Sequence, residues 1–318
     1  MSFPFITEEE FPQAEETILK PFLRDHVVHE MISSRDGTAL STYYALQDHP
    51  RGTVVFVHGF CEFFGKYHEL FWEYFTNGFN VFFVELRGHG LSERKVKNHE
   101  LVYVESFKEY EEDVIALIQT LAEPKSPARP RILFAHSMGG CVGACLLEDC
   151  PSLFDKAVLS SPMLEMRFGN FNDREVKVIN DVSKAVGLRK TPTPGAKGWT
   201  GEEDFEHSSC LSYARYHYQF HQREENESYR TWDATYAWAR AGKEASERSI
   251  RNARNVVVPV LLCQAGKDNM VRPDGQNAFA EKALNTRIAA FPESRHEIFN
   301  ADDESRRAFY KAMDEFLK

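Results

Sequence analysis

The 318-residue sequence has no run of about 18 consecutive apolar residues, so it predicts no membrane-spanning helix. Its start, MSFPFITEEEFPQAEE, is acidic where a secretory leader would be basic and then apolar, and no targeting segment is visible. Positive charge is in deficit, because the formal net charge is -10. This deficit argues against a nucleic-acid partner and against electrostatic attachment to anionic lipid. We expect a cytoplasmic protein, with transient contact to a neutral membrane surface, such as the inner membrane, left open.

The sequence also lacks any pattern of paired cysteines. Its six cysteines form no C-x-x-C motif and no spacing typical of secreted disulfides (Cys61, Cys141, Cys145, Cys150, Cys210, Cys263). We expect buried thiols in a reducing compartment. The hydrophobic content of 42% supports a core, and the length suits one large α/β domain with an insertion, or two domains.

The segment 131–143, RILFAHSMGGCVG, is typical of a strand, a sharp turn and a helix, with Ser137 at the apex of the turn. Only small residues fit around such a turn, and the sequence places Ala135 and Gly139 there. The usual pattern is G-x-S-x-G, from which Ala135 departs by one methyl group. The helix beginning at Met138 would direct its free amides and positive dipole end at an oxyanion above Ser137. On this segment alone, a glycine-rich helix start with an incidental serine remains an alternative.

Apolar runs elsewhere predict a series of buried strands. TVVFV at 53–57 ends in His58-Gly59-Phe60, and the run 79–86 ends in Arg87-Gly88-His89-Gly90. Loops at the carboxyl ends of parallel strands form the binding site of an α/β sheet, so the amide of Phe60 is predicted to be a second oxyanion donor beside that of Met138. The glycine-rich turn lacks the G-x-G-x-x-G order, so we interpret it as a loop at the pocket rim rather than a phosphate cradle.

Strands alternate with helices at 66–76 and 104–121, which predicts an α/β fold with a mostly parallel sheet flanked by helices. The pattern stops at 162–255, where helical segments rich in aromatic residues and a Pro/Gly-rich connection at 191–201 occur. It resumes with strands at 256–265 and 286–291 and helices at 274–284 and 302–316. We predict a core of residues 1–161 and 256–318 and a helical cap of residues 162–255.

Three polar residues each follow a predicted strand on the same edge of this sheet: Ser137, Asp268 and His296. Their order along the chain is that of the α/β-hydrolases. His296 can take the serine proton and return it to the leaving group, while Asp268 would hold the imidazole and stabilise its charged form. Asp274 is the alternative acid, although it precedes a helix as a capping residue does. His136 points away from the strand end by alternation, so it is interpreted as structural.

Metal binding has one weak signal in this sequence. His217 and His221 lie four residues apart on a predicted cap helix, but no glutamate follows His217 as H-E-x-x-H requires. We therefore expect no metal and no cofactor. The adjacent Arg223-Glu224-Glu225 is interpreted as a solvated helix face.

Four motifs resemble the capped α/β-hydrolases that include monoacylglycerol lipases and bacterial lysophospholipases. They are HGFCEFFGKYHEL at 58–70, RGHGLSE at 87–93, AHSMGG at 135–140 and SRHEIFN at 294–300. The cap phrase TYAWARAG at 235–242 is also similar, and the resemblance covers nearly the whole chain.

The resemblance implies a catalytic triad of Ser137, Asp268 and His296, with the amides of Phe60 and Met138 as the oxyanion hole. It further implies that Glu62 orders the oxyanion loop, and Glu85 stands where many relatives carry aspartate. The implied activity is serine-dependent hydrolysis of a carboxylic ester through an acyl-enzyme. The implied substrate carries one acyl chain, as a lysophospholipid or a monoacylglycerol does.

Three alternatives remain open. One is a carboxylesterase for small esters. Another is a proline-type aminopeptidase of the same fold, in which Glu202, Glu203 and Asp204 would bind a free amine. The third is a non-catalytic ligand-binding protein. A dehalogenase or epoxide hydrolase is disfavoured because those enzymes place aspartate at the turn, and the oligomeric state is left open.

Overall fold

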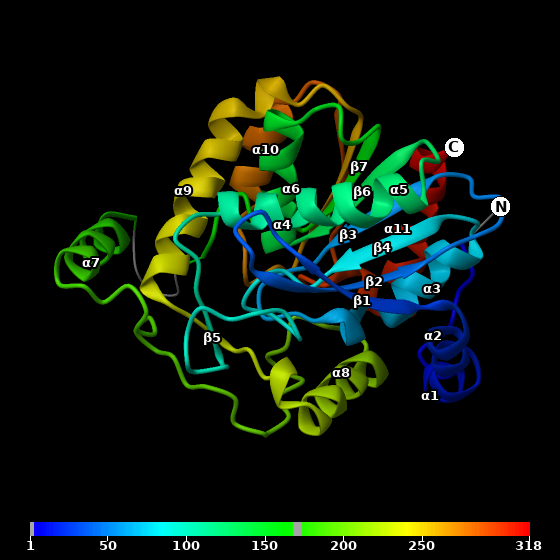
Figure 1. Ribbon diagram of the computed structural model, residues 1–318, viewed down its shortest axis with the longest axis horizontal. Helices are drawn as coiled ribbons and strands as arrows, with labels where there is room; N and C mark the ends of the chain where they lie inside the picture. The colour runs from blue at the N-terminus through cyan, green and yellow to red at the C-terminus, as the bar shows by residue number, and fades with distance from the viewer. Residues whose placement is uncertain (1–2, 168–172) are drawn as a thin grey trace.

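A central sheet of eight strands organises the molecule (Figure 1). The computed structural model describes residues 3–167 and 173–318. The strands lie in the order β1-β2-β4-β3-β6-β7-β9-β10. β2 pairs antiparallel with β1 and β4, and the other neighbours pair in parallel. Their bounds are β1 Val28–Ser33, β2 Ala39–Ala45, β3 Thr53–Val57, β4 Asn80–Val84, β6 Arg131–His136, β7 Lys156–Ser160, β9 Val260–Ala265 and β10 Thr286–Phe291.

Helices cover both faces of this sheet, which confirms the predicted fold class. Successive side chains of a strand point to opposite faces. Val55 and Val57 of β3 accordingly pack with α4, α6 and α9, whereas Val54 and Phe56 pack with α3 and α11. The helices are α1 Phe11–Ala14, α2 Lys20–His26, α3 His68–Thr76, α4 Lys108–Leu117, α5 Glu123–Lys125, α6 Met138–Asp149, α7 Asp173–Ala185, α8 Tyr213–Glu225, α9 Tyr236–Asn252, α10 Pro273–Lys282 and α11 Asp303–Leu317.

The sequence pattern did not predict two short strands. β5 (Leu101–Val102) and β8 (Asp233–Ala234) form a separate two-stranded parallel ladder. Two residues are too few to show the alternation by which a strand is recognised. This ladder connects the loop that follows β4 to the inserted segment.

The segment between β7 and β9 contains α7, α8 and α9, and we propose that residues 162–255 are the cap. α7 stands away from the body of the molecule, and α8 lies below the edge of the sheet (Figure 1). α9 packs against α6 and α10 on the core. Residues 168–172 of this predicted cap lie outside the described part. α7 is thus the helix of this segment that projects, whereas α8 is joined to the core by the ion pair of Arg215 with Glu69 at 2.7 Å (Figure 1).

Candidate active site

Ser137 occupies the sharp turn between β6 and α6. Its φ of 52° and ψ of -117° lie in a region that costs a residue other than glycine about 1–3 kcal/mol. The surrounding backbone holds it there, because its amide donates to the carbonyl of Ser160 at 3.0 Å. A Cβ at Gly139 would lie 2.3 Å from the carbonyl oxygen of Val57. A side chain at position 139 would therefore clash with the end of β3. Ala135 lies against α6 instead, because its Cβ is 3.2 Å from the position that a Cβ at Gly143 would take.

His296 lies between Ser137 and Asp268. Its Nε2 is 2.8 Å from Ser137 Oγ, and its Nδ1 is 2.7 Å from Asp268 Oδ2. In the tautomer that serves both contacts, Nδ1–H donates to the carboxylate and Nε2 accepts from the hydroxyl. Ser161 Oγ donates to the carbonyl of His296 at 2.7 Å and so holds its main chain. The structure therefore brings these three predicted residues together.

Asp268 stays ionised near neutral pH. Its burial would raise the pKa of the carboxyl, but the hydrogen bond and charge of His296 lower that pKa more. The amides of Met270 and Val271 also donate to Oδ1, at 2.8 and 3.0 Å. The alternative acid, Asp274, lies exposed in the first turn of α10. A carboxylate held at Asp268 can orient the imidazole and stabilise its charged form.

The amides of Phe60 and Met138 donate no hydrogen bond within the described part of the chain. Glu62 orders the loop that carries Phe60, because its buried carboxylate accepts from the Gly59 amide and the Tyr67 hydroxyl, both at 2.5 Å. His58 supports the same loop, since its Nε2 accepts from the amide of Leu86 at 2.9 Å. Two such free amides can stabilise an oxyanion, and one donor is worth about 2.7–4 kcal/mol.

Lys66 connects the oxyanion loop to the histidine loop, a role that the sequence pattern did not reveal. Its Nζ lies 2.5 Å from Glu62 Oε1 and 2.7 Å from Glu297 Oε1, and all three side chains are at most 6% exposed. Burial would raise the pKa of Glu62, but the charge of Lys66 keeps that pKa below its usual range. The i, i+4 spacing of Glu62 and Lys66 was the one available signal.

His136, beside the turn, is a buried neutral side chain. Burial lowers its pKa to about 4, and its Nδ1 contacts the carbonyl of Ser160 at 3.0 Å. Its ring centroid lies 4.9 Å from that of His296. Alternation predicts a ring that points away from the strand end, whereas the ring packs against His296; within the described residues it hydrogen-bonds to none of Ser137, Asp268 and His296.

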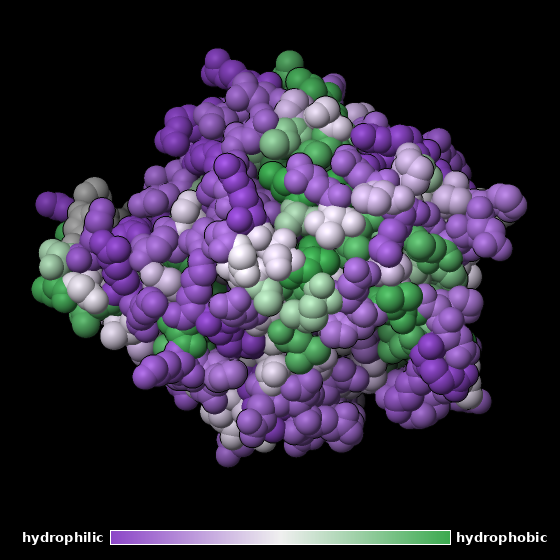
Figure 2. All heavy atoms as spheres, viewed as in Figure 1, coloured by the Kyte–Doolittle hydropathy of each residue, from purple (hydrophilic) through white to green (hydrophobic). Residues whose placement is uncertain are grey.

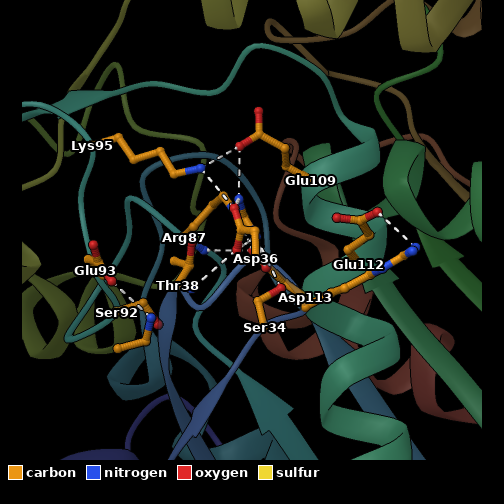
Figure 3. Close-up of polar contacts among 12 residues, drawn as sticks. Ser34, Asp36, Thr38, Arg87, Ser92, Glu93, Lys95, Glu109, Glu112 and Asp113 are labelled. Carbon is orange, nitrogen blue, oxygen red and sulfur yellow. Dashed lines mark hydrogen bonds and ion pairs between the residues drawn. The ribbon is translucent and has the colours of Figure 1, made fainter.

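The glycine-rich turn at 87–90 donates three of its amides to protein groups: that of Arg87 to Asp113 at 3.2 Å, that of Gly88 to the carbonyl of Glu93 at 2.9 Å and that of His89 to the carbonyl of Leu86 at 3.0 Å. Glu85 accepts from the amides of Phe64 and Leu91 at 2.9 and 2.7 Å, and its carboxylate fills the space where Gly90 would carry a Cβ. Arg87 is buried among Asp36, Glu109 and Asp113 in the cluster of Figure 3. These contacts join the turn to α4 and to the loops on either side of it.

The remaining predicted polar residues lie on the cap. His217 contacts Glu203 at 2.6 Å and His221 contacts Glu224 at 3.3 Å, and both imidazoles are more than half exposed. The described residues include no group of three or more side chains suited to a metal ion. The interpretation of Arg223 as part of a solvated face is wrong. Glu224 and Glu225 are exposed, but Arg223 turns inward to the oxyanion loop, where Nη2 donates to the carbonyl of Cys61 at 2.8 Å.

A model of the family described as serine aminopeptidase S33, a family of hydrolases, matches residues 48–303. This match covers most of the chain. The chain belongs to the serine aminopeptidase S33 family. Lysophospholipase L2 of Escherichia coli K12 is 29% identical to this S33-family chain over 240 residues, which cover 75% of the chain and 69% of the relative. The monoacylglycerol lipase of Mycolicibacterium smegmatis is 25% identical over 257 residues, covering 80% and 84%.

Solved structures share the fold of this S33-family chain. A carboxyl esterase from Bacillus coagulans superposes with a TM-score of 0.74 at 17% identity, covering 92% of the chain and 98% of the neighbour. A monoacylglycerol lipase from Paleococcus ferrophilus superposes with a TM-score of 0.65 at 23% identity, with the same coverage. The chain therefore belongs to a family of serine hydrolases and has the α/β-hydrolase fold, as the motifs predicted.

Proposed function

We propose that this protein hydrolyses the ester of a lipid with one acyl chain, a lysophospholipid or a monoacylglycerol. Ser137 attacks the carbonyl while His296 takes its proton, and Asp268 stabilises the imidazolium. The amides of Phe60 and Met138 bind the oxyanion. The resulting acyl-enzyme is then hydrolysed by water that His296 activates, and no metal or cofactor takes part.

One observation carries this proposal. His296 is hydrogen-bonded to Ser137 at 2.8 Å and to Asp268 at 2.7 Å. The amides of Phe60 and Met138, which donate to no described residue, lie in the same site. The lipid class is supported by relatives named lysophospholipase and monoacylglycerol lipase. Aromatic side chains around the oxyanion loop supply an apolar surface suited to an alkyl chain, and the rings of Phe60 and Trp238 lie 4.2 Å apart.

An acyl-chain series tests the lipid assignment. We expect kcat/KM to rise from acetyl to longer acyl esters, because each buried methylene contributes roughly 0.8 kcal/mol. Rates on p-nitrophenyl esters of increasing length, measured below their aggregation limit, provide the readout. A flat or falling series would reject the lipid substrate and favour the carboxylesterase for small esters.

The aminopeptidase alternative finds little support in the cap. Of its three predicted acidic residues, Glu203 pairs with His217 and Asp204 contacts His207 at 2.8 Å on the surface. Both carboxylates already pair with histidines. Neither contacts Ser137 or its hydrogen-bond partners in the described part. Faster cleavage of a proline arylamide than of the matching aryl ester would revive this alternative.

We further propose a transient contact between α7 and a neutral lipid surface. Val178, Val182 and Val186 recur every fourth residue in and just after α7, and they are 56%, 56% and 62% exposed. Apolar side chains lie beside hydrophilic ones on the part of the molecule where α7 projects (Figure 2). No helix within 3–167 and 173–318 has the length and apolar character needed to cross a bilayer. An apolar stripe on such a projecting helix can insert only shallowly.

Replacing these three valines with serine should abolish co-flotation with phosphatidylcholine vesicles, because the inserted apolar area is lost. The matched control replaces three exposed apolar residues away from the cap, Val257, Leu284 and Ile288, and should float as the native protein does. Equal flotation of both variants, or none by the native protein, would contradict the contact.

A further inference from the structure

Arg223, at the end of α8, has no carboxylate partner among the described residues. Its Nε donates to the carbonyl of Tyr229 at 3.1 Å and its Nη2 to that of Cys61 at 2.8 Å. Its Nη1 has no hydrogen-bond partner in the described part of the chain. Carbonyl groups carry no net charge, so this guanidinium keeps an uncompensated positive charge.

Aromatic rings surround the Arg223 guanidinium. Its carbon lies 5.2 Å from the ring centre of Phe63, 5.8 Å from that of Trp199 and 5.5 Å from that of Trp232. Removal from water lowers the pKa of Arg223, although an arginine remains charged in proteins. A half-buried cation of this kind is costly unless an anion accompanies it.

A second unpaired guanidinium lies close by. Arg94 donates to the carbonyls of Gly90, Ser92 and Ser228 at 2.6–3.1 Å, and no carboxylate within the described ranges pairs with it. Arg94 and Arg223 contact the same short turn, residues 227–229. Two positive charges therefore flank this turn in a protein whose net charge is -10.

The turn itself carries Glu227, which pairs with Arg230 at 3.5 Å, and other carboxylates of this region also have partners. Glu62 and Glu297 share Lys66, and Asp233 accepts from the amide of Gly198 at 2.7 Å. The carbonyl that Arg223 contacts belongs to Cys61, the residue after the proposed oxyanion donor Phe60. Phe60 and Cys61 are partly exposed, so Arg223 contacts the loop that carries Phe60 at a point open to solvent.

We propose that Arg223 binds the phosphate of a lysophospholipid head group and makes such a lipid the preferred substrate over a monoacylglycerol. This assignment rests on the proposed function. The free Nη1 offers two N–H donors, and a charge-assisted bond to phosphate is about twice as strong as a neutral one. The aromatic rings around the guanidinium stabilise its charge, and Arg94, which contacts the same turn, adds to the positive potential there.

The test compares two substrates with the same acyl chain, a lysophosphatidylglycerol and a 1-monoacylglycerol, both below their aggregation limits. In Arg223→Gln the ratio of kcat/KM for the phospholipid to that for the monoacylglycerol should fall about 10- to 100-fold, as expected for a lost bond to a charged group. Arg223→Lys keeps the positive charge but loses the planar guanidinium with its paired N–H donors, so it should give an intermediate ratio. Arg189→Gln removes one exposed positive charge elsewhere in the cap and should keep the native ratio.

Each other outcome is informative. An equal fall on both substrates would overturn the assignment and make Arg223 a structural link between the cap and the oxyanion loop. Inhibition of both substrates to the same extent by inorganic phosphate, with an unchanged ratio in Arg223→Gln, would mean a site for free anions instead. If the native protein cleaved p-nitrophenyl acetate but neither lipid, the proposed function itself would fail, and the head-group assignment with it.

Discussion

Replacing Ser137 with alanine should lower kcat for ester hydrolysis by about 10⁶-fold, the loss that accompanies removal of a serine nucleophile. The hydroxyl is the group that His296 contacts at 2.8 Å, and no other described side chain hydrogen-bonds to His296 Nε2. Intact-mass spectrometry after treatment with a fluorophosphonate gives the direct readout. The native protein should gain one adduct, which maps to Ser137, and the variant should gain none.

Ser160→Ala is the matched control for this experiment. Ser160 is a buried serine at the end of the neighbouring strand β7, and its hydroxyl has no partner in the described part. The control should form the adduct as the native protein does. An adduct that persists in Ser137→Ala would place the nucleophile elsewhere. A folded native protein that formed no adduct would support the non-catalytic ligand-binding alternative.

Asp268→Asn should lower kcat by about 10⁴-fold at neutral pH, because an amide stabilises neither the imidazolium nor the tautomer that accepts the serine proton. The substitution keeps the shape of the side chain. Steady-state rates on a p-nitrophenyl ester measure the loss, and thermal unfolding verifies that the variant is folded.

Asp274→Asn distinguishes the two predicted acids. Asp274 lies exposed in the first turn of α10, so its loss should cost only about 0.3–1 kcal/mol of stability through the helix dipole. A large loss of kcat in Asp274→Asn together with a small one in Asp268→Asn would reverse the assignment.

Asp268 should also affect how stability depends on pH. The pKa of Asp268 is lowered in the folded protein, so its ionised form stabilises the fold above its unfolded pKa near 3.9. This contribution is lost as the pH falls through the lowered pKa. The native protein should therefore lose more Tm between about pH 5 and pH 2 than Asp268→Asn does, whereas the two should change alike between pH 7 and pH 5.

Strand positions in the core were predictable where the local signal was unambiguous. TVVFV forms β3 with its predicted bounds, since a short continuous apolar run suits a strand buried on both faces. Val256–Val258 are as apolar as the strand that follows, but β9 begins at Val260. A strand starts where a neighbour can pair with it, and β10 and β7 begin their ladders at this point. The local sequence does not indicate which strands pair with β9, so it could not predict where β9 begins.

Residue types and chain order were enough to predict the α/β sheet and to select Ser137, Asp268 and His296, because parallel strands bring their carboxyl ends to one edge. The packing of distant segments decided the rest. Gly139 is required by the end of β3. Lys66 pairs with Glu62, its i, i+4 neighbour, and also with Glu297 in the distant histidine loop. Arg223 turns inward while Glu224 and Glu225 stay exposed.

 Glu297 lies far from Lys66 along the sequence, so their ion pair exists only in the folded chain.

The physical reason is the range of the interactions. Periodicity and turn chemistry act over a few neighbouring residues and can be recognised from the chain alone. A buried ion pair or an inward-facing arginine depends on which segments meet in space, and only the tertiary structure brings those segments together.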